Sequence, residues 1–371
     1  MTIRNSQVRP ATSIPPATGV VSPGVMHRSA SRYRALRCAA FLLLCAVRAG
    51  AASAEAQDGY TLGDGYQIPG TDWHLGGYAT ASVTDPQGEP ARVAIDNLSM
   101  FLWWQGDGRW KFFSEFEYEN PISNRSDRLL SDDYFSWERA YLEYALSDTI
   151  SIRGGKFLTP IGRWNLIHAT PLVWTTSRPL VTTLPFPTNM TGLMVTTTIP
   201  SLANGMEVSL YGAGAGEIRP NPDIDPFSSA LGTHVTLSLS GESQIGFSYV
   251  DFEQEKSRPE RKQLVGVDGL WTHDRFELSA EAVYRSSNSG GALDERGAYV
   301  QLVAPLSERL YAVGRYETFK LSNDQQATEM WVTGLNFRVT PALVLKAEWV
   351  EARHNTSQAP DGFLASISVL L

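Results

Sequence analysis

Segments of about ten residues, in which large apolar side chains alternate with polar ones, recur along most of this chain. In residues 109–119, for example, one set holds Trp110, Phe112, Phe116 and Tyr118, and the other holds Lys111, Glu115, Glu117 and Glu119. A period of two places successive side chains on opposite faces of a β-strand. Beyond residue 47 no apolar run approaches the roughly 20 residues that a membrane-spanning helix needs. The sequence therefore predicts an all-β protein.

The alternation and the turn residues between segments predict sixteen strands. They are residues 73–84, 91–104, 109–119, 134–146, 149–157, 190–199, 204–213, 230–240, 243–254, 261–272, 274–285, 295–304, 308–320, 328–339, 342–353 and 363–371. Every second connection is a tight turn, and most of the others are longer and polar. An outer-membrane barrel has this sorting of loops and an even strand count. Because only a closed barrel pairs every backbone group of strands in hydrocarbon, we expect residues 57–371 to form a transmembrane antiparallel β-barrel of about 16 strands.

The first 56 residues have a different character. Four arginines in residues 26–37 precede the apolar run Cys38–Val47, and small residues follow in Ala51–Ala56. This order is typical of a secretory signal peptide, with cleavage expected after Ala54 or Ala56. Residues 1–56 are therefore predicted to be a leader and cleavable signal, and translation is suspected to start at Met26, because signal peptides normally begin at the initiator.

Cysteine usage and charge narrow the function. Both cysteines, Cys38 and Cys45, lie in the predicted signal, so no disulfide is expected in the mature chain. Removing residues 1–56 takes away seven of 31 basic residues and one of 39 acidic residues, which leaves a net charge of −14. Nucleic acid is therefore not an expected partner, because phosphate contacts need a cationic surface. No metal-ligand cluster or cofactor motif stands out, so no metal or cofactor is predicted.

The connection between the fifth and sixth predicted strands, residues 158–189, is much longer than the others. Its many apolar residues need cover, which the inside of a wide barrel would supply. We therefore predict that this loop folds inward and narrows the channel. Arg163, His168 and Arg178 are then candidates for the pore constriction, because a charge in a narrow pore acts more strongly than one in bulk water. The alternative is that Arg163 and Arg178 anchor the loop by pairing with carboxylates of the lumen wall.

The alternation of side chains along each strand also predicts which charged residues face the lumen. They are Lys111, Glu115, Glu117, Arg139, Glu143, Glu281, Arg285, Arg315, Glu317, Lys346 and Glu348. Both signs occur, so the sequence leaves open whether anions or cations are preferred.

The segment Arg153–Asn165, a strand ending in Gly-Lys-Phe followed by Thr-Pro-Ile-Gly, resembles the strand-to-loop segment of bacterial outer-membrane porins of the phosphate-selective porin O and P superfamily. The resemblance in pattern covers the whole mature chain. It implies a location in the outer membrane of a Gram-negative bacterium and suggests a homotrimer. Phosphate selectivity in that superfamily is attributed to rows of arginine and lysine side chains in the lumen. The predicted inner faces here mix basic with acidic residues.

The leading hypothesis is a porin for passive diffusion of small hydrophilic solutes or ions, with membrane lipid and solutes as its partners. A non-conducting structural or adhesin-type barrel is the first alternative. An outer-membrane hydrolase is the second, but the sequence contains no Gly-x-Ser-x-Gly or His-Glu-x-x-His motif and its histidines are scattered. The protein is therefore not expected to be an enzyme.

Overall fold

A computed structural model describes residues 60–371, apart from residues 107, 124–133, 168, 203, 215, 223 and 358. The predicted leader, residues 1–56, lies outside the described residues. Sixteen of the described strands form one ring: β3 (Trp73–Pro86), β4 (Arg92–Gln105), β5 (Trp110–Ser123), β6 (Tyr134–Ala145), β7 (Ile150–Leu158), β8 (Asn189–Ile199), β9 (Met206–Ala213), β10 (Phe227–Ser238), β11 (Gln244–Gln254), β12 (Arg261–His273), β13 (Phe276–Ser287), β14 (Glu295–Pro305), β15 (Leu310–Lys320), β16 (Thr328–Arg338), β17 (Leu343–Arg353) and β18 (Gly362–Leu370).

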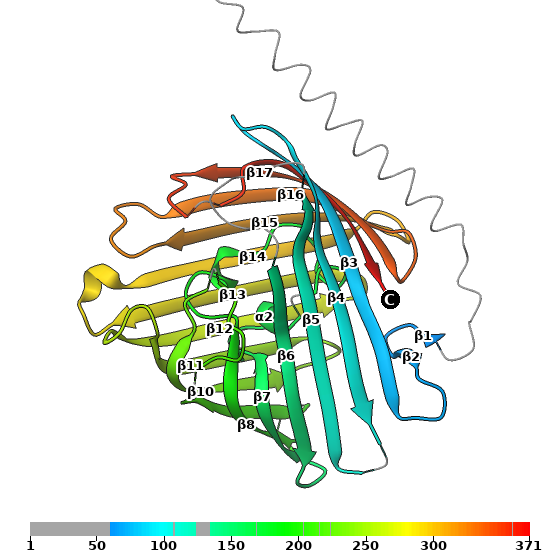
Figure 1. The fold of residues 1–371 in the computed structure, drawn as a ribbon. Coiled ribbons are helices and arrows are strands. Elements are labelled where there is room, and N and C mark those ends of the chain that lie inside the picture. Colours follow the sequence, from blue (N-terminus) through cyan, green and yellow to red (C-terminus); the bar gives the residue numbers. More distant parts are fainter. Residues whose placement is uncertain are drawn as a thin grey trace, which may run out of the picture.

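Each of these strands pairs antiparallel with its neighbour in the chain, and β18 closes the ring on β3, where Ile367 lies opposite Ala81 (Figure 1). The closed barrel confirms the predicted fold and strand count. Several predicted strand ends are displaced, and the largest difference is at β5, which continues to Ser123, beyond the expected end at Glu119. Asn120 and Pro121 are residues typical of loops, yet pairing with β4 continues to Ser123, which lies opposite Ala94.

Three short helical segments and a small hairpin complete the described chain. The helical segments are α2 (Trp164–Ile167), η1 (Leu180–Thr182) and η2 (Gly291–Leu293). Strands β1 (Tyr60–Thr61) and β2 (Gly65–Gln67) form the hairpin, and β2 pairs with the start of β3. The sequence did not predict this hairpin, because strands of two and three residues are too short to show an alternation. No helix in the described part of the chain is both long and apolar enough to cross a membrane.

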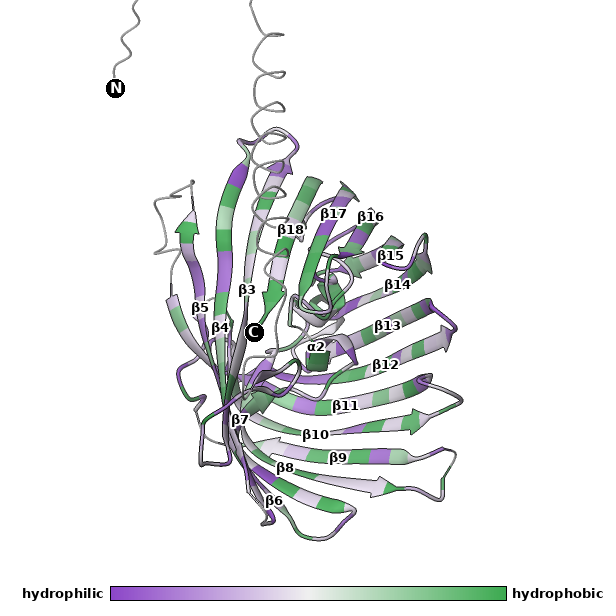
Figure 2. Ribbon diagram, turned by 90° about the vertical axis from the view of Figure 1, so that its right-hand side faces the viewer, coloured by the Kyte–Doolittle hydropathy of each residue, from purple (hydrophilic) through white to green (hydrophobic). Residues whose placement is uncertain are grey.

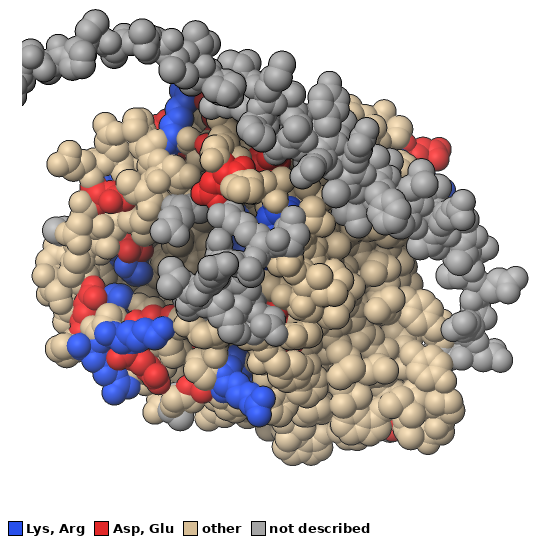
Figure 3. Space-filling view, turned by 45° about the horizontal axis from the view of Figure 1, so that its top comes forward, with Lys and Arg blue, Asp and Glu red and all other residues tan. Residues whose placement is uncertain are grey.

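The alternation separates an apolar outer face from an inner face of mixed character. On β11, Phe247 and Tyr249 are 50% and 41% exposed on the outside. Ser248 and Val250, which alternate with them along the strand, are buried on the inside. The same outward exposure of large apolar side chains recurs around the ring, at Leu193, Leu210, Leu231, Val265, Leu302, Trp331 and Trp349. Figure 2 shows the alternation along the strands, and in Figure 3 the charged side chains gather toward one end, leaving much of the barrel's side almost free of them. An apolar surface of this extent suits lipid, because soluble proteins rarely expose one.

A β-bulge interrupts the pairing of β5 with β6. Glu115 lies opposite Arg139 and Phe116 lies opposite Trp137, so Glu138 has no partner of its own in the ladder. A bulge of this kind re-aims side chains at a strand's inner face. Glu138 thereby joins the inward-facing acidic residues of β5.

Candidate functional site

The long loop, residues 159–188, lies inside the barrel and carries α2 and η1 (Figures 1 and 2). The predicted inward fold is therefore confirmed. Apolar side chains on one side of the loop join the apolar part of the inner wall in a buried core. The loop contributes Ile161, Trp164, Leu180, Val181 and Phe186, and the strands contribute residues such as Phe157, Met190, Phe252, Leu264 and Phe319. This packing explains how a loop so rich in apolar residues is stable inside a barrel.

Three carboxylates of the wall bind the backbone of the long loop. Glu281 of β13 accepts a hydrogen bond from the amide N of Trp164 at 2.6 Å. Glu317 of β15 accepts one from the amide N of Leu180 at 2.7 Å. Glu348 of β17 accepts two, from the amide N of Thr176 at 3.0 Å and of Ser177 at 2.7 Å. These carboxylates satisfy amides that a buried loop could not pair within itself.

Three cations of the wall bind carbonyl oxygens of the same loop. Arg315 Nη1 donates to Ser177 O at 3.1 Å, and Lys346 Nζ donates to Thr175 O at 3.2 Å. Arg285 Nη1 donates to Pro185 O at 3.1 Å. Two of these cations also pair with acids: Arg315 Nε lies 3.0 Å from Glu317 Oε1, and Arg285 Nη2 lies 2.6 Å from Glu295 Oε1.

The wall charges on β13, β15 and β17 therefore hold the loop. Glu281, Arg315, Glu317, Lys346 and Glu348 are each at most 5% exposed. A hydrogen bond to a charged group contributes about 1.5–3 kcal/mol to stability, and a charge left unpaired in such a site would be costly. The sequence selected these residues by parity as lumen-facing, and the structure places them against the loop.

The three constriction candidates differ in their surroundings. Arg178 is partly exposed, and its guanidinium donates to Asn165 Oδ1 at 2.6 Å and to Thr182 Oγ1 at 3.1 Å, so its hydrogen bonds lie within the loop. Desolvation by the surrounding protein lowers the pKa of the Arg178 guanidinium, and nearby acids, Glu138 foremost, oppose that shift. Arg163 is partly exposed, and its side chain has no hydrogen bond or ion pair among the described residues. His168 lies outside the described residues.

The wall formed by β5–β10 is less covered by the loop. A cavity of about 550 Å³, here called the wall cavity, is lined by these strands and by the short turn between β6 and β7. Its charged lining consists of Lys111, Arg139, Glu143, Asp148, Arg153 and Glu207. Arg139 Nε pairs with Glu115 Oε2 at 2.6 Å, and Arg153 Nη2 pairs with Glu143 Oε2 at 2.6 Å. This side of the inner wall therefore presents both signs of charge.

An aromatic stripe crosses the inner face of β3–β6, beside the wall cavity. Tyr78, Phe101, Phe113 and Tyr141 follow one another on β3, β4, β5 and β6, with ring centroids 5.6–5.8 Å apart. The guanidinium of Arg139 lies 4.5 Å from the centroid of Phe113 and that of Arg153 lies 4.2 Å from Tyr141. Cation–π contacts of this kind fix the two arginines against the wall.

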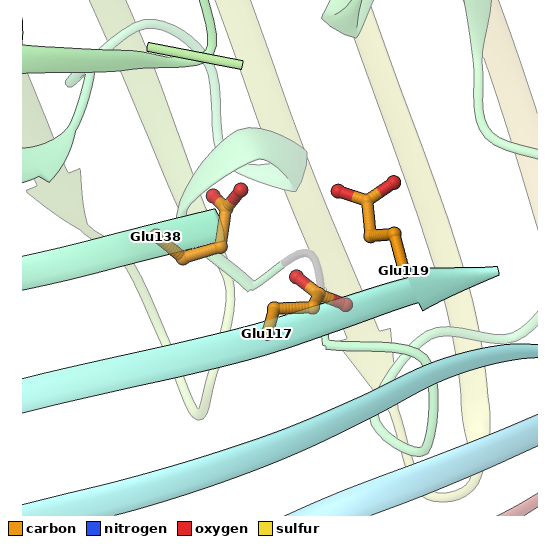
Figure 4. Close-up of side chains that lie close together, drawn as sticks. All are labelled: Glu117, Glu119 and Glu138. Carbon is orange, nitrogen blue, oxygen red and sulfur yellow. The ribbon is translucent and has the colours of Figure 1, made fainter. Parts of the chain in front are cut away.

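Three glutamates lie close together on β5 and β6. Glu117, Glu119 and Glu138 have carboxylate oxygens within 4.8 Å of one another (Figure 4). Asn189 Nδ2 donates to Glu138 Oε2 at 2.8 Å, so part of the group is already bound by protein. The sequence predicted that Glu117 faces the lumen, but it did not predict this for Glu138. The alternation of side chains along β6 could not have predicted an inward Glu138, because Glu138 faces inward only through the bulge.

One histidine has a serine within hydrogen-bond distance. His234 Nδ1 lies 2.8 Å from Ser248 Oγ, and its Nε2 lies 3.0 Å from Thr236 Oγ1. The amide N of Gly162 in the long loop donates to Ser248 Oγ at 3.2 Å. A hydrolytic triad needs a carboxylate on the second ring nitrogen and an accessible serine. Here the hydroxyl of Thr236 stands where a triad would have its carboxylate, and the loop covers Ser248. The pair therefore fits attachment of the loop better than catalysis.

The chain is similar to known proteins mainly in its fold. No family model matches the sequence. An uncharacterized protein of Aquifex aeolicus (strain VF5) is 26% identical over 183 residues, or 47% of this chain, and the chain spans only 40% of that relative's length.

Solved structures with a similar fold include three outer-membrane channels. An anion-selective porin from Comamonas acidovorans has a TM-score of 0.58 at 11% identity, covering 81% of this chain and 98% of that one. OmpF of Salmonella typhi, in complex with daunomycin, gives 0.59 at 11% identity, covering 81% and 97%. OprB of Pseudomonas putida gives 0.56 at 9% identity, covering 81% and 94%. The barrel described here therefore has the fold of bacterial outer-membrane porins.

Proposed function

We propose that this protein is a porin of a bacterial outer membrane, through which small hydrophilic solutes or ions diffuse passively. One observation carries the proposal: a closed barrel with an apolar outside holds an inward loop that is fixed to one part of its wall and leaves the wall cavity of about 550 Å³ along β5–β10. Sixteen-stranded barrels are wide enough for an aqueous channel. Residues 1–56 would then act as the leader that directs export.

The constriction in this proposal lies where the long loop faces β5 and β6. Arg178 would contribute positive charge from the loop, and Glu117 and Glu138 negative charge from the wall. Arg163 would add positive charge on the opposite side of the loop, which faces β13 and β14. The buried residues Arg285, Arg315, Glu317, Lys346 and Glu348 would act as anchors of the loop, because their charges are already bound to it. Lys111, Arg139 and Glu143 would line the solute path.

The extensive packing of the loop favours one alternative, a non-conducting structural or adhesin-type barrel. The buried core between the loop and β7–β18 fills much of the barrel on one side. A plugged barrel would have no need of the charged lining of the wall cavity, which is why conduction is the preferred function. A homotrimer remains part of the proposal as the assembly suggested by the sequence resemblance.

Electrical recording distinguishes the two functions. Protein purified from outer membranes and added to a planar lipid bilayer in KCl should give discrete ohmic current steps. Deletion of residues 164–184 should raise the conductance and weaken ion selectivity, measured as the reversal potential across a KCl gradient. A folded protein that gives no current steps would establish the plugged barrel instead, and a deletion variant with unchanged conductance would place the loop outside the conducting path.

A further inference from the structure

A second, smaller cavity lies between the first half of the long loop and the inner face of β13–β16. It has a volume of about 130 Å³ and is here called the loop pocket. Trp164 and Trp174 line it from the loop, together with Arg163, and Gln301 and Arg338 line it from the wall. The pocket is distinct from the wall cavity, because the two have no lining residue in common.

Both tryptophans of the loop pocket are held in place. The amide N of Trp164 is bound by Glu281, and the Trp164 ring meets the edge of Tyr299 with centroids 6.0 Å apart. The carbonyl O of Trp174 accepts a hydrogen bond from Asn336 Nδ2 at 3.0 Å, and its ring lies 4.9 Å from that of Tyr311. A binding surface formed by these rings needs little ordering when a ligand arrives, which favours affinity.

The guanidinium of Arg338 distinguishes the pocket from ordinary packing. It lies over the Trp174 ring at 4.5 Å, and its Nε is buried without a hydrogen-bond partner. Among the described residues Arg338 has no ion pair, whereas Arg315 on the neighbouring strand β15 and Arg285 on β13 each pair with a glutamate. A buried guanidinium N–H without an acceptor costs free energy, so Arg338 gains by turning toward a ligand that supplies one.

Arg163 places a second guanidinium at the same pocket. Asp268 interacts with it electrostatically, but neither carboxylate oxygen of Asp268 has a hydrogen-bond partner among the described residues. Glu277 is the one acidic residue of the lining. The lining itself therefore holds two arginines and one glutamate, and Ile167, Leu172 and Val173 give it an apolar side.

We propose that the loop pocket binds small organic carboxylates, as a subsite on the solute path of the channel. The planar fork of a guanidinium matches a carboxylate, and the indole rings with the aliphatic side chains match a short carbon chain. The volume is roughly ten times the least that holds one water molecule, so the ligand has on the order of five to ten non-hydrogen atoms. Because this inference names a substrate class for the proposed porin, it rests on the proposed function.

The test measures binding and conduction separately on the full-length folded protein. Tryptophan fluorescence in detergent micelles is titrated with butyrate, with its uncharged analogue butyramide and with inorganic phosphate, and Trp174→Phe assigns the signal. The variants are Arg338→Gln, Arg338→Lys and Arg163→Gln. Arg353→Gln is the matched control, because Arg353 is 62% exposed and paired with Glu351. The same proteins are then recorded in planar bilayers with and without butyrate.

Butyrate should bind the wild-type protein, and butyramide and phosphate should bind much more weakly. Arg338→Gln should weaken butyrate binding by about tenfold or more, Arg163→Gln should weaken it less, and the control should not change it. Arg338→Lys should fall between wild type and Arg338→Gln, because it keeps the charge and loses the fork. The inference is overturned if butyrate leaves the fluorescence unchanged, if phosphate binds equally well, or if both glutamine variants behave as the control. Binding without current steps would leave the subsite standing and refute the porin.

Discussion

Replacing Glu348 by alanine removes one of the buried wall charges that hold the long loop. The carboxylate accepts hydrogen bonds from the amide N of Thr176 at 3.0 Å and of Ser177 at 2.7 Å, and it is 3% exposed. Two hydrogen bonds to a charged group, at about 1.5–3 kcal/mol each, amount to about 3–6 kcal/mol. The strand ladder of β17 uses backbone groups only, so the loss should fall on the loop while the barrel stays closed.

The expected result is a loop that is partly released around Thr176. Glu281 and Glu317 still hold it at Trp164 and Leu180, so complete release is not expected. Because the loop stays partly attached, the fall in the free energy of unfolding should not exceed the about 3–6 kcal/mol of the two hydrogen bonds. The current through the channel should show larger fluctuations and a higher mean, because the segment near Ser177 can leave the wall.

Two measurements check this prediction. Urea titration in micelles gives the free energy of unfolding, and planar-bilayer recording in KCl gives the conductance and its fluctuations. The control is Glu351→Ala on the same strand, because the Glu351 side chain is 49% exposed and paired with Arg353. If Glu348→Ala matches this control in both measurements, the carboxylate does not hold the loop and the reasoning is refuted.

Three further changes test other parts of the structure. Val300→Lys on the apolar outer face should lower the free energy of unfolding in lipid by about 2–4 kcal/mol, if the residue lies near the bilayer centre. Gly162→Ala should destabilise the loop by about 1–2 kcal/mol or more, because Gly162 has a φ of 66° and an added Cβ would meet the Glu281 carboxylate. Burial raises the pKa of Glu217, and Lys156 opposes that rise. The folded protein therefore holds this proton more tightly than the unfolded chain, and ionisation of Glu217 subtracts stability as the pH rises from the usual glutamate pKa through the raised one. Glu217→Gln should flatten that part of the stability curve, measured by urea titration at a series of pH values.

Each of these three changes has a control in the same chain. Val300→Leu should leave stability in lipid nearly unchanged, and an equal loss for lysine and leucine would place Val300 away from lipid. Gly216→Ala should be tolerated, since an added Cβ there meets only Glu255 Oε1 at 3.6 Å. Glu242→Gln, in an exposed turn, should keep the wild-type pH profile, and so would Glu217→Gln if Glu217 titrated normally.

The barrel could be predicted from sequence because its signal is local. Alternation along a strand such as β11 depends only on which face each residue occupies, and loop lengths are read directly from the spacing between strands. The inward fold of the long loop followed from the apolar residues that needed cover. The parity of β13, β15 and β17 also identified Glu281, Arg315 and Glu348 as charged residues of an inner face.

Only the tertiary structure showed what those charges contact. Glu348 meets Ser177 across 171 positions in the sequence, and no periodicity within either segment specifies that pairing. The bulge that turns Glu138 inward, and the Arg338 Nε that lacks a hydrogen-bond partner among the described residues, likewise cannot be predicted from the alternation along a strand. The physical reason is that sequence periodicity fixes the face of a strand, whereas the height and depth at which a loop meets that face depend on closure of the whole ring and on packing of the loop within it.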